Sequence, residues 1–160
     1  MSRRPTVQEI AIHEAGHAVI ARVLGVRTLH IELCPDGKEY CGQCNYAPDR
    51  PSDLDSATAS YAGTAAERRI NPSATLHGTD KTNFERRAKP VMRDYVMRRA
   101  ETLVAAHWDE IEKLAAELVR CDGLYTDELE KLGYYWPPPK REPSALQRVL
   151  SGSRRLPSDT

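Results

Sequence analysis

The sequence predicts an α+β domain that is predominantly α-helical, with a small β-hairpin or sheet beside its first helix. Segments with helix start and stop signals take up most of the chain, whereas only residues 26–47 have the composition of two strands and a turn. With 160 residues, of which 40% are hydrophobic, the chain is long enough to bury one core without disulfides. We expect this domain to span residues 1–135.

The first predicted helix covers residues 7–24. Thr6 is a favoured N-cap residue, and Glu9 three positions later completes a capping box. Gly25 stands where a helix C-terminus favours a residue that adopts positive φ. Between these signals the helix is apolar on most sides, which is typical of a buried helix.

A β-hairpin and a second helix are predicted next. Residues 26–33 alternate in character along the chain and contain β-branched side chains, as a strand does. Pro35-Asp36-Gly37 has the residues of a turn, and residues 39–47 can return as the partner strand. The helix that follows is expected to run from an N-cap at Ser52 to about Ile70.

Residues 80–120 are predicted to be helical in two pieces. Pro90 either kinks the first piece or closes a turn, and a join is expected near His107. Thr126 is then predicted to cap a last short helix over residues 127–132.

A change of composition marks the end of the domain. Residues 136–160 are rich in Pro, Arg and Ser and poor in apolar residues, which is typical of a disordered tail. Residues 145–150 are an exception, because their spacing also fits a short docking helix.

The charge balance and the cysteine content exclude several classes of protein. The chain has 23 basic and 23 acidic side chains, so it lacks the basic surplus typical of nucleic-acid binding. No apolar run approaches the roughly 18 residues of a membrane span. Four cysteines in a chain of this size do not form a secreted disulfide framework, and we therefore expect a cytoplasmic protein.

Three of the cysteines lie in the hairpin region, at Cys34, Cys41 and Cys44. Cys41 and Cys44 have C-x-x-C spacing, so a second, structural metal site or a redox role is one interpretation. Strand alternation speaks against this interpretation, because it places Cys41 and Cys44 on opposite faces unless the strand ends there.

The motif that carries chemistry is His13-Glu14-Ala15-Gly16-His17, which matches H-E-x-x-H within the first helix. Residues i and i+4 of a helix share one face, so both imidazoles can bind one metal ion, with Glu14 beside them as a proton acceptor. The pattern also arises by chance. Here, however, it interrupts a buried apolar helix, where each polar group without a partner costs about 1–3 kcal/mol. A catalytic zinc site has three protein ligands, so a third is expected from elsewhere in the chain.

Further segments follow this motif in order and resemble one known family. They are Val26-Arg27-Thr28-Leu29-His30-Ile31 with Pro35-Asp36-Gly37, Ala62-Gly63-Thr64-Ala65-Ala66-Glu67, Gly78-Thr79-Asp80 followed by Ala88 and Val91-Met92, and residues 118–132. Together with the zinc-helix motif, which continues to Ala18, they resemble the peptidase domain of the FtsH-like zinc metallopeptidases over residues 7–133.

The resemblance implies that the third zinc ligand is an aspartate that opens the helix after the family's G-A-S-N-D loop. That position falls on Asp80, and a carboxylate at a helix start is also favoured by the helix dipole. Without the family, Asp80 would be interpreted only as a helix cap. Glu67, in the segment similar to the family's G-G-R-A-A-E, is the competing ligand. The chain departs from the family at Ala62, which replaces a paired glycine, and in a loop before Asp80 that is one residue shorter.

Motif and resemblance together predict a zinc-dependent endopeptidase. His13, His17 and Asp80 would hold one catalytic Zn²⁺ ion, and Glu14 would assist the attack of zinc-bound water on a peptide carbonyl. The family's ATPase ring and membrane helices have no counterpart in these 160 residues. We therefore expect ATP-independent cleavage of unfolded or flexible polypeptide. The resemblance implies that this substrate lies along the strand at residues 39–47. Delivery of the substrate by a separate partner is compatible with this expectation.

Two alternative functions remain. One is a catalytically silent zinc-binding interaction module, against which the presence of Glu14 speaks, because a structural zinc site does not need that carboxylate. The other is a zinc hydrolase that acts on a non-peptide amide.

Overall fold

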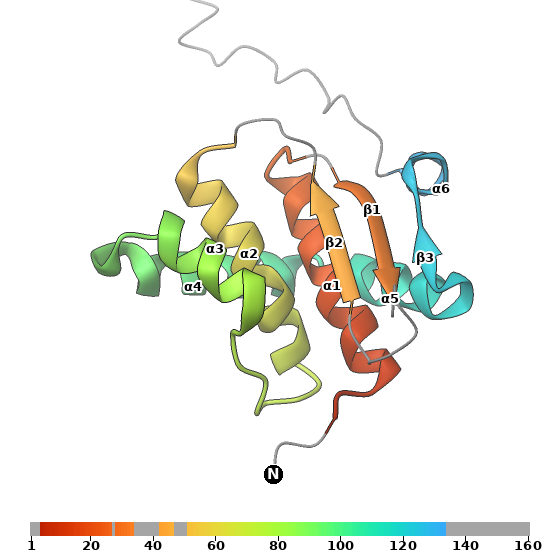
Figure 1. Ribbon diagram of the computed structural model, residues 1–160, viewed down its shortest axis with the longest axis horizontal. Coiled ribbons are helices and arrows are strands. Elements are labelled where there is room, and N and C mark those ends of the chain that lie inside the picture. The colour runs from red at the N-terminus through yellow and green to blue at the C-terminus, as the bar shows by residue number, and fades with distance from the viewer. Residues whose placement is uncertain (1–3, 27, 34–41, 47–50, 134–160) are drawn as a thin grey trace, which may run out of the picture.

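The computed structural model describes residues 4–26, 28–33, 42–46 and 51–133. Within them the fold is predominantly helical with a small antiparallel sheet, as predicted (Figure 1). The helices are α1 Val7–Val23, α2 Asp53–Arg68, α3 Gly78–Arg87, the 3-10 helix η1 Pro90–Met92, α4 Arg93–Ala106, α5 Trp108–Cys121 and α6 Thr126–Lys131. The strands are β1 Thr28–Leu33, β2 Gly42–Tyr46 and β3 Gly123–Leu124.

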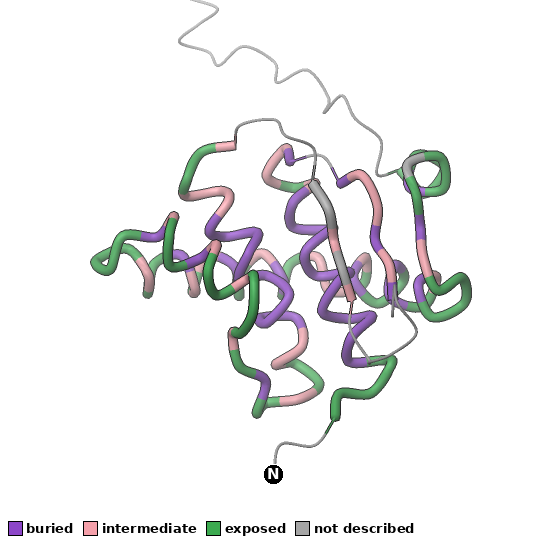
Figure 2. Tube along the Cα trace, viewed as in Figure 1, coloured by how far each residue is buried: buried purple, intermediate pink, exposed green. Residues whose placement is uncertain are grey.

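The central element is α1, and the prediction of its start is confirmed. The Thr6 hydroxyl accepts a hydrogen bond from the Glu9 N–H at 3.2 Å, and the Glu9 carboxylate accepts one from the Thr6 N–H at 2.7 Å. Gly25, just after the helix, has the expected positive φ of 76°. The middle of α1 is buried on all sides, because α2, α5 and the strands β1 and β2 pack around it (Figure 2).

The predicted hairpin is present as the antiparallel pair β1 and β2, in a register that places Leu33 opposite Gly42. Its turn, Pro35-Asp36-Gly37, lies outside the described residues. A third strand was not predicted: in β3, Leu124 pairs with Ile31 of β1. The strand order β2-β1-β3 leaves β2 at one edge of the described sheet.

Ser52 caps α2 as predicted, and its hydroxyl accepts a hydrogen bond from the Asp55 N–H at 3.1 Å. Residues 80–120 form three α-helices instead of two pieces. Pro90 starts the 3-10 turn η1 between α3 and α4, since proline has no N–H with which to continue a helix. The join near His107 is confirmed, because His107 separates α4 from α5.

The end of the described chain differs from the prediction by one residue. Tyr125, and not Thr126, is the N-cap of α6, and its N–H donates to the Glu128 carboxylate at 3.0 Å. Just before this, Asp122 has a φ of 61°, a left-handed turn that directs the chain back along β1 and so creates β3. Residues 134–160, which include the predicted tail and its segment 145–150, lie outside the described residues.

The core forms where α1 meets its neighbours. Its fully buried large side chains include Ile12, Ile20, Ile31, Tyr61 and Leu118. Burying each apolar side chain of this size stabilises the fold by about 1.5–3 kcal/mol. This packing fixes where α2 stands relative to α1, and the buried Phe84 of α3 packs in turn on Tyr61 of α2. Among the described helices we find no candidate for a membrane span.

Candidate metal centre

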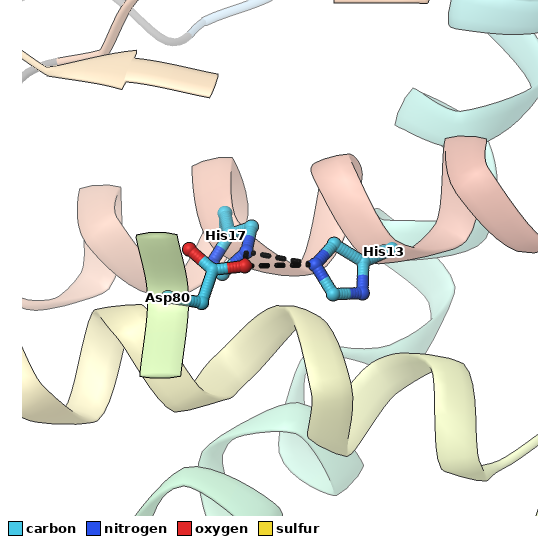
Figure 3. A group of neighbouring side chains, drawn as sticks. All are labelled: His13, His17 and Asp80. Carbon is cyan, nitrogen blue, oxygen red and sulfur yellow. Dashed lines mark hydrogen bonds and ion pairs between the residues drawn. The ribbon is translucent and has the colours of Figure 1, made fainter. Parts of the chain in front are cut away.

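The two histidines of the H-E-x-x-H motif lie one turn apart on the face of α1 that packs against α2. Their exposed fractions are 7% for His13 and 3% for His17, and their Nε2 atoms are 3.1 Å apart. The ring planes are nearly perpendicular, at 77°. Both imidazoles therefore direct the same nitrogen to one point (Figure 3).

Asp80 brings a carboxylate to this point from the first turn of α3. Its Oδ2 atom lies 3.1 Å from Nε2 of His13 and 3.1 Å from Nε2 of His17. The helix starts at Gly78, two residues earlier than predicted, so Asp80 lies inside its first turn, where the helix dipole favours a negative charge. The structure thus brings together the three residues predicted to be metal ligands, although α1 and α3 are far apart in the chain.

The Nδ1 atoms of both rings are hydrogen-bonded to groups of α2, and these hydrogen bonds determine which nitrogen of each ring carries the proton. Nδ1 of His17 lies 2.7 Å from the Ala59 carbonyl oxygen, which can only accept, so this Nδ1 carries a proton. Nδ1 of His13 lies 3.0 Å from Oε2 of Glu67 and donates to it in the same way. In the neutral form of each ring, Nε2 is then the nitrogen with the lone pair. Glu67, the competing ligand candidate, lies on the Nδ1 side of His13 and not at the point where the three atoms meet.

The chemistry of this donor set fits a zinc ion. Nε2 of both rings and Oδ2 of Asp80 meet at mutual distances of 3.1 Å. When both rings are neutral, two nitrogen lone pairs and a negative oxygen therefore face one another, and they repel unless a cation lies between them. In a tetrahedral zinc site with ligand bonds of about 2.0–2.1 Å, the ligand atoms lie about 3.3 Å apart. Among the described residues, His13, His17 and Asp80 are the one such group close enough to hold a metal ion.

Without a metal, protons supply the positive charge. Burial of His13 opposes protonation, but hydrogen bonds with Asp80 and Glu67 outweigh it and raise the pKa to about 10. Burial also opposes protonation of His17, yet the charge of Asp80 raises its pKa. Burial acts against ionisation of Asp80, but the charge of His17 and the hydrogen bonds from both rings keep the pKa of Asp80 below its usual range. The site therefore retains a negative carboxylate that is ready to hold a cation.

Glu14 lies beside this cluster and is only 6% exposed. Burial raises its pKa, while the charges of His17 and His13 act in the opposite direction. No described residue hydrogen-bonds to its carboxylate. Gly42, the first residue of β2, packs directly against it: a Cβ built at Gly42 would lie 2.7 Å from Cδ of Glu14. A buried carboxyl with a raised pKa and no fixed partner among the described residues is suited to proton transfer.

None of the other described histidines and cysteines belongs to this group of three. His77 is exposed at the start of α3, with its ring centroid 6.3 Å from that of His13. His30 stacks on Tyr125, with ring centroids 5.8 Å apart. Cys44 is half-buried and packs against the core, whereas Cys34 and Cys41 lie outside the described residues, so the second metal site proposed there stays a prediction.

Two residues of α2 that position the His17 ring were not identified from the sequence. The first is the Ala59 carbonyl, which has no side-chain signal. The second is Gly63, which leaves room for the His17 ring; a Cβ there would lie 2.7 Å from Cδ2 of His17. Its signal is a glycine inside a helix, which costs about 1 kcal/mol relative to alanine and therefore indicates a close approach. With Glu67, these residues form a row at four-residue spacing along one face of α2.

Comparison with known proteins adds no family assignment. No protein-family model matches the chain, and no curated protein matches it.

Proposed function

We propose that this protein is a zinc-dependent endopeptidase, similar to the FtsH-like metallopeptidases, that cleaves unfolded or flexible polypeptide without ATP. The observation that carries the proposal is the meeting of Nε2 of His13, Nε2 of His17 and Oδ2 of Asp80 at 3.1 Å, beside the buried Glu14. Three protein ligands with a carboxylate next to them are the arrangement of catalytic zinc sites.

In this mechanism His13, His17 and Asp80 would hold the zinc ion. When bound, zinc supplies a Lewis acid that polarises a carbonyl and makes water more acidic. Glu14 accepts the proton of the attacking water and then passes it to the nitrogen of the leaving amine. Burial of Glu14 supports this role, because it raises the carboxyl pKa and makes the captured proton easier to hold until transfer.

The position of β2 supports a polypeptide substrate. β2 is at the edge of the described sheet, so its outer side can pair with an added extended strand. Its first residue, Gly42, lies against Glu14. A peptide that extends the sheet along β2 would therefore pass next to the proton acceptor. Such pairing requires an extended segment, and delivery of that segment by a separate partner is part of the proposal.

The silent zinc module is the less favoured alternative. A purely structural site is closed by four protein ligands, whereas the described group provides three. Glu14 would also be a buried carboxyl without a function, at a cost in stability. No feature of the described residues favours a non-peptide amide.

The experiment compares wild type with Glu14→Gln, using fluorescently labelled casein as an unfolded substrate and elemental analysis for zinc. We expect one zinc per chain in both proteins, and cleavage about 10²–10⁴-fold slower in Glu14→Gln, because the general base is lost. Glu85→Gln, at an exposed position on α3, is the matched control and should retain wild-type activity. Equal cleavage by wild type and Glu14→Gln would refute the mechanism, and a wild-type protein that binds zinc but cleaves nothing would favour the silent module.

A further inference from the structure

We propose that Glu67 is a positioning residue that holds the His13 ring in the tautomer and orientation needed to bind the metal, and so sets the affinity of the site. This inference rests on the zinc site of the proposed function, but not on its peptidase activity. The observation behind it is the 3.0 Å contact between Nδ1 of His13 and Oε2 of Glu67, whose side chain is only 14% exposed.

The geometry separates this role from that of a ligand. Oε2 of Glu67 is bound to Nδ1 of His13, whereas the cluster with His17 and Asp80 forms at Nε2 of the same ring. These two nitrogens lie on different sides of the imidazole, so Glu67 acts on the cluster through the ring.

Glu67 is itself held in place. Its second oxygen, Oε1, accepts a hydrogen bond from the Asn71 side-chain amide at 3.4 Å, one turn further along the chain. The α2 backbone also stands close to α1, because Gly16 of α1 has no Cβ; one built there would lie 2.6 Å from Cβ of Ala66, the residue before Glu67. The carboxylate is therefore fixed relative to His13 by the contact between the two helices.

The two histidines have different outer partners, and this makes the role of Glu67 specific. Nδ1 of His17 donates to a neutral backbone carbonyl, that of Ala59, whereas Nδ1 of His13 donates to a carboxylate. A carboxylate partner increases the electron density on the ring and strengthens Nε2 as a donor to a metal. We infer that His13 is the stronger of the two imidazole ligands, and that removing Glu67 affects His13 and leaves His17 unchanged.

The first measurement is zinc affinity. Metal-free protein is titrated with Zn²⁺ in competition with a chromophoric chelator. Glu67→Ala is expected to bind one zinc about 10–100-fold more weakly than wild type, as removal of such an outer partner typically does. Glu67→Gln should fall between the two, because its neutral oxygen can still accept from Nδ1. Glu85→Ala, at an exposed position on α3, is the control and should match wild type.

The second measurement reports on the rings themselves. Long-range proton–nitrogen NMR correlation of the zinc-loaded protein identifies which ring nitrogen carries the proton. In wild type we expect Nδ1 of both rings to be protonated. In Glu67→Ala the Nδ1 proton of His13 should exchange faster with water, while the His17 signals stay the same. His17 is thus an internal control, because a general loss of structure would change both rings.

The outcomes decide the inference in either direction. Zinc affinity within about twofold of wild type in Glu67→Ala, or equal changes at His13 and His17, would overturn it. Complete loss of stoichiometric zinc from Glu67→Ala and Glu67→Gln, with both variants folded by circular dichroism, would make Glu67 a ligand and also overturn it. A wild-type protein that binds zinc without cleaving casein would contradict only the peptidase proposal, since neither measurement here uses proteolysis.

Discussion

The Cα atom of Gly63 in α2 lies directly against the imidazole of His17 in α1, so that a Cβ at this position would stand 2.7 Å from Cδ2 of the ring. The same imidazole donates through Nδ1 to the Ala59 carbonyl one turn earlier in α2. The missing side chain of Gly63 therefore permits the helix spacing at which His17 is both held and directed to the cluster.

Gly63→Ala should disturb the metal site. The added methyl group must displace the His17 ring or push α2 away from α1, and overpacking of this kind costs about 1–3 kcal/mol of unfolding free energy. We expect at least a tenfold loss of zinc affinity together with a lower melting temperature. Gly123→Ala in β3 is the control, because a Cβ there meets its nearest atom, the Ile31 carbonyl oxygen, at 3.4 Å. Wild-type zinc affinity in Gly63→Ala would show that the contact has no role in the site.

Gly42→Ala should separate proton transfer from metal binding. A Cβ at Gly42 would lie 2.7 Å from Cδ of Glu14, and its three nearest atoms all belong to Glu14, so this carboxyl is the group that must move. We expect zinc content to be unchanged and kcat for casein cleavage to fall about 100-fold, because a displacement of a catalytic group by about 1 Å costs about this much in rate. Unchanged kcat would mean that the position of Glu14 is not limiting.

Asp80→Ala should remove the third ligand. With only two imidazoles left, we expect the protein to lose stoichiometric zinc during purification, whereas Asp80→Glu should retain part of the affinity because it keeps a carboxylate. Inductively coupled plasma mass spectrometry gives the zinc content. Zinc retained by Asp80→Ala but lost from Glu67→Ala would reverse the assignment of the two carboxylates.

Zinc binding should release protons in a pH-dependent way. The pKa of His13 in the metal-free protein is raised to about 10, so at pH 8 its ring is almost fully protonated and must lose one proton to bind zinc through Nε2. Calorimetric titration at pH 8 in two buffers with different ionisation enthalpies measures the protons released, and we expect one proton or more per zinc ion bound. No proton release at pH 8 would contradict this protonation state.

The same shift makes a prediction about the metal-free protein. A pKa raised above the unfolded value of 6.5 means that protonated His13 stabilises the fold. This contribution is complete below about pH 6.5 and is lost as the pH rises towards 10. Wild-type metal-free protein should therefore lose melting temperature over this range more steeply than His13→Gln. Parallel curves for the two proteins would rule out His13 as the source.

Local sequence signals determined the elements that carry the histidines. The Thr6–Glu9 capping box set the start of α1, and four-residue spacing placed His13 and His17 on one face, because these features depend only on helix geometry. Signals of the same kind located the hairpin and the Ser52 cap of α2. Local signals did not predict the elements that depend on pairing between distant segments. Both β3 and the Tyr125 cap depend on the left-handed turn at Asp122 and on an open position beside β1.

The sequence by itself thus identified His13 and His17 as candidate metal ligands, with Glu14 beside them. The resemblance added Asp80 as the candidate third ligand. Only the tertiary structure decided that Asp80 and Glu67 approach opposite nitrogens of His13, at Nε2 and Nδ1. The physical reason is that the position of a carboxylate more than 50 residues from His13 is set by helix packing, here by the α1–α2 contact that Gly16 and Gly63 allow. No local spacing rule describes such a distance.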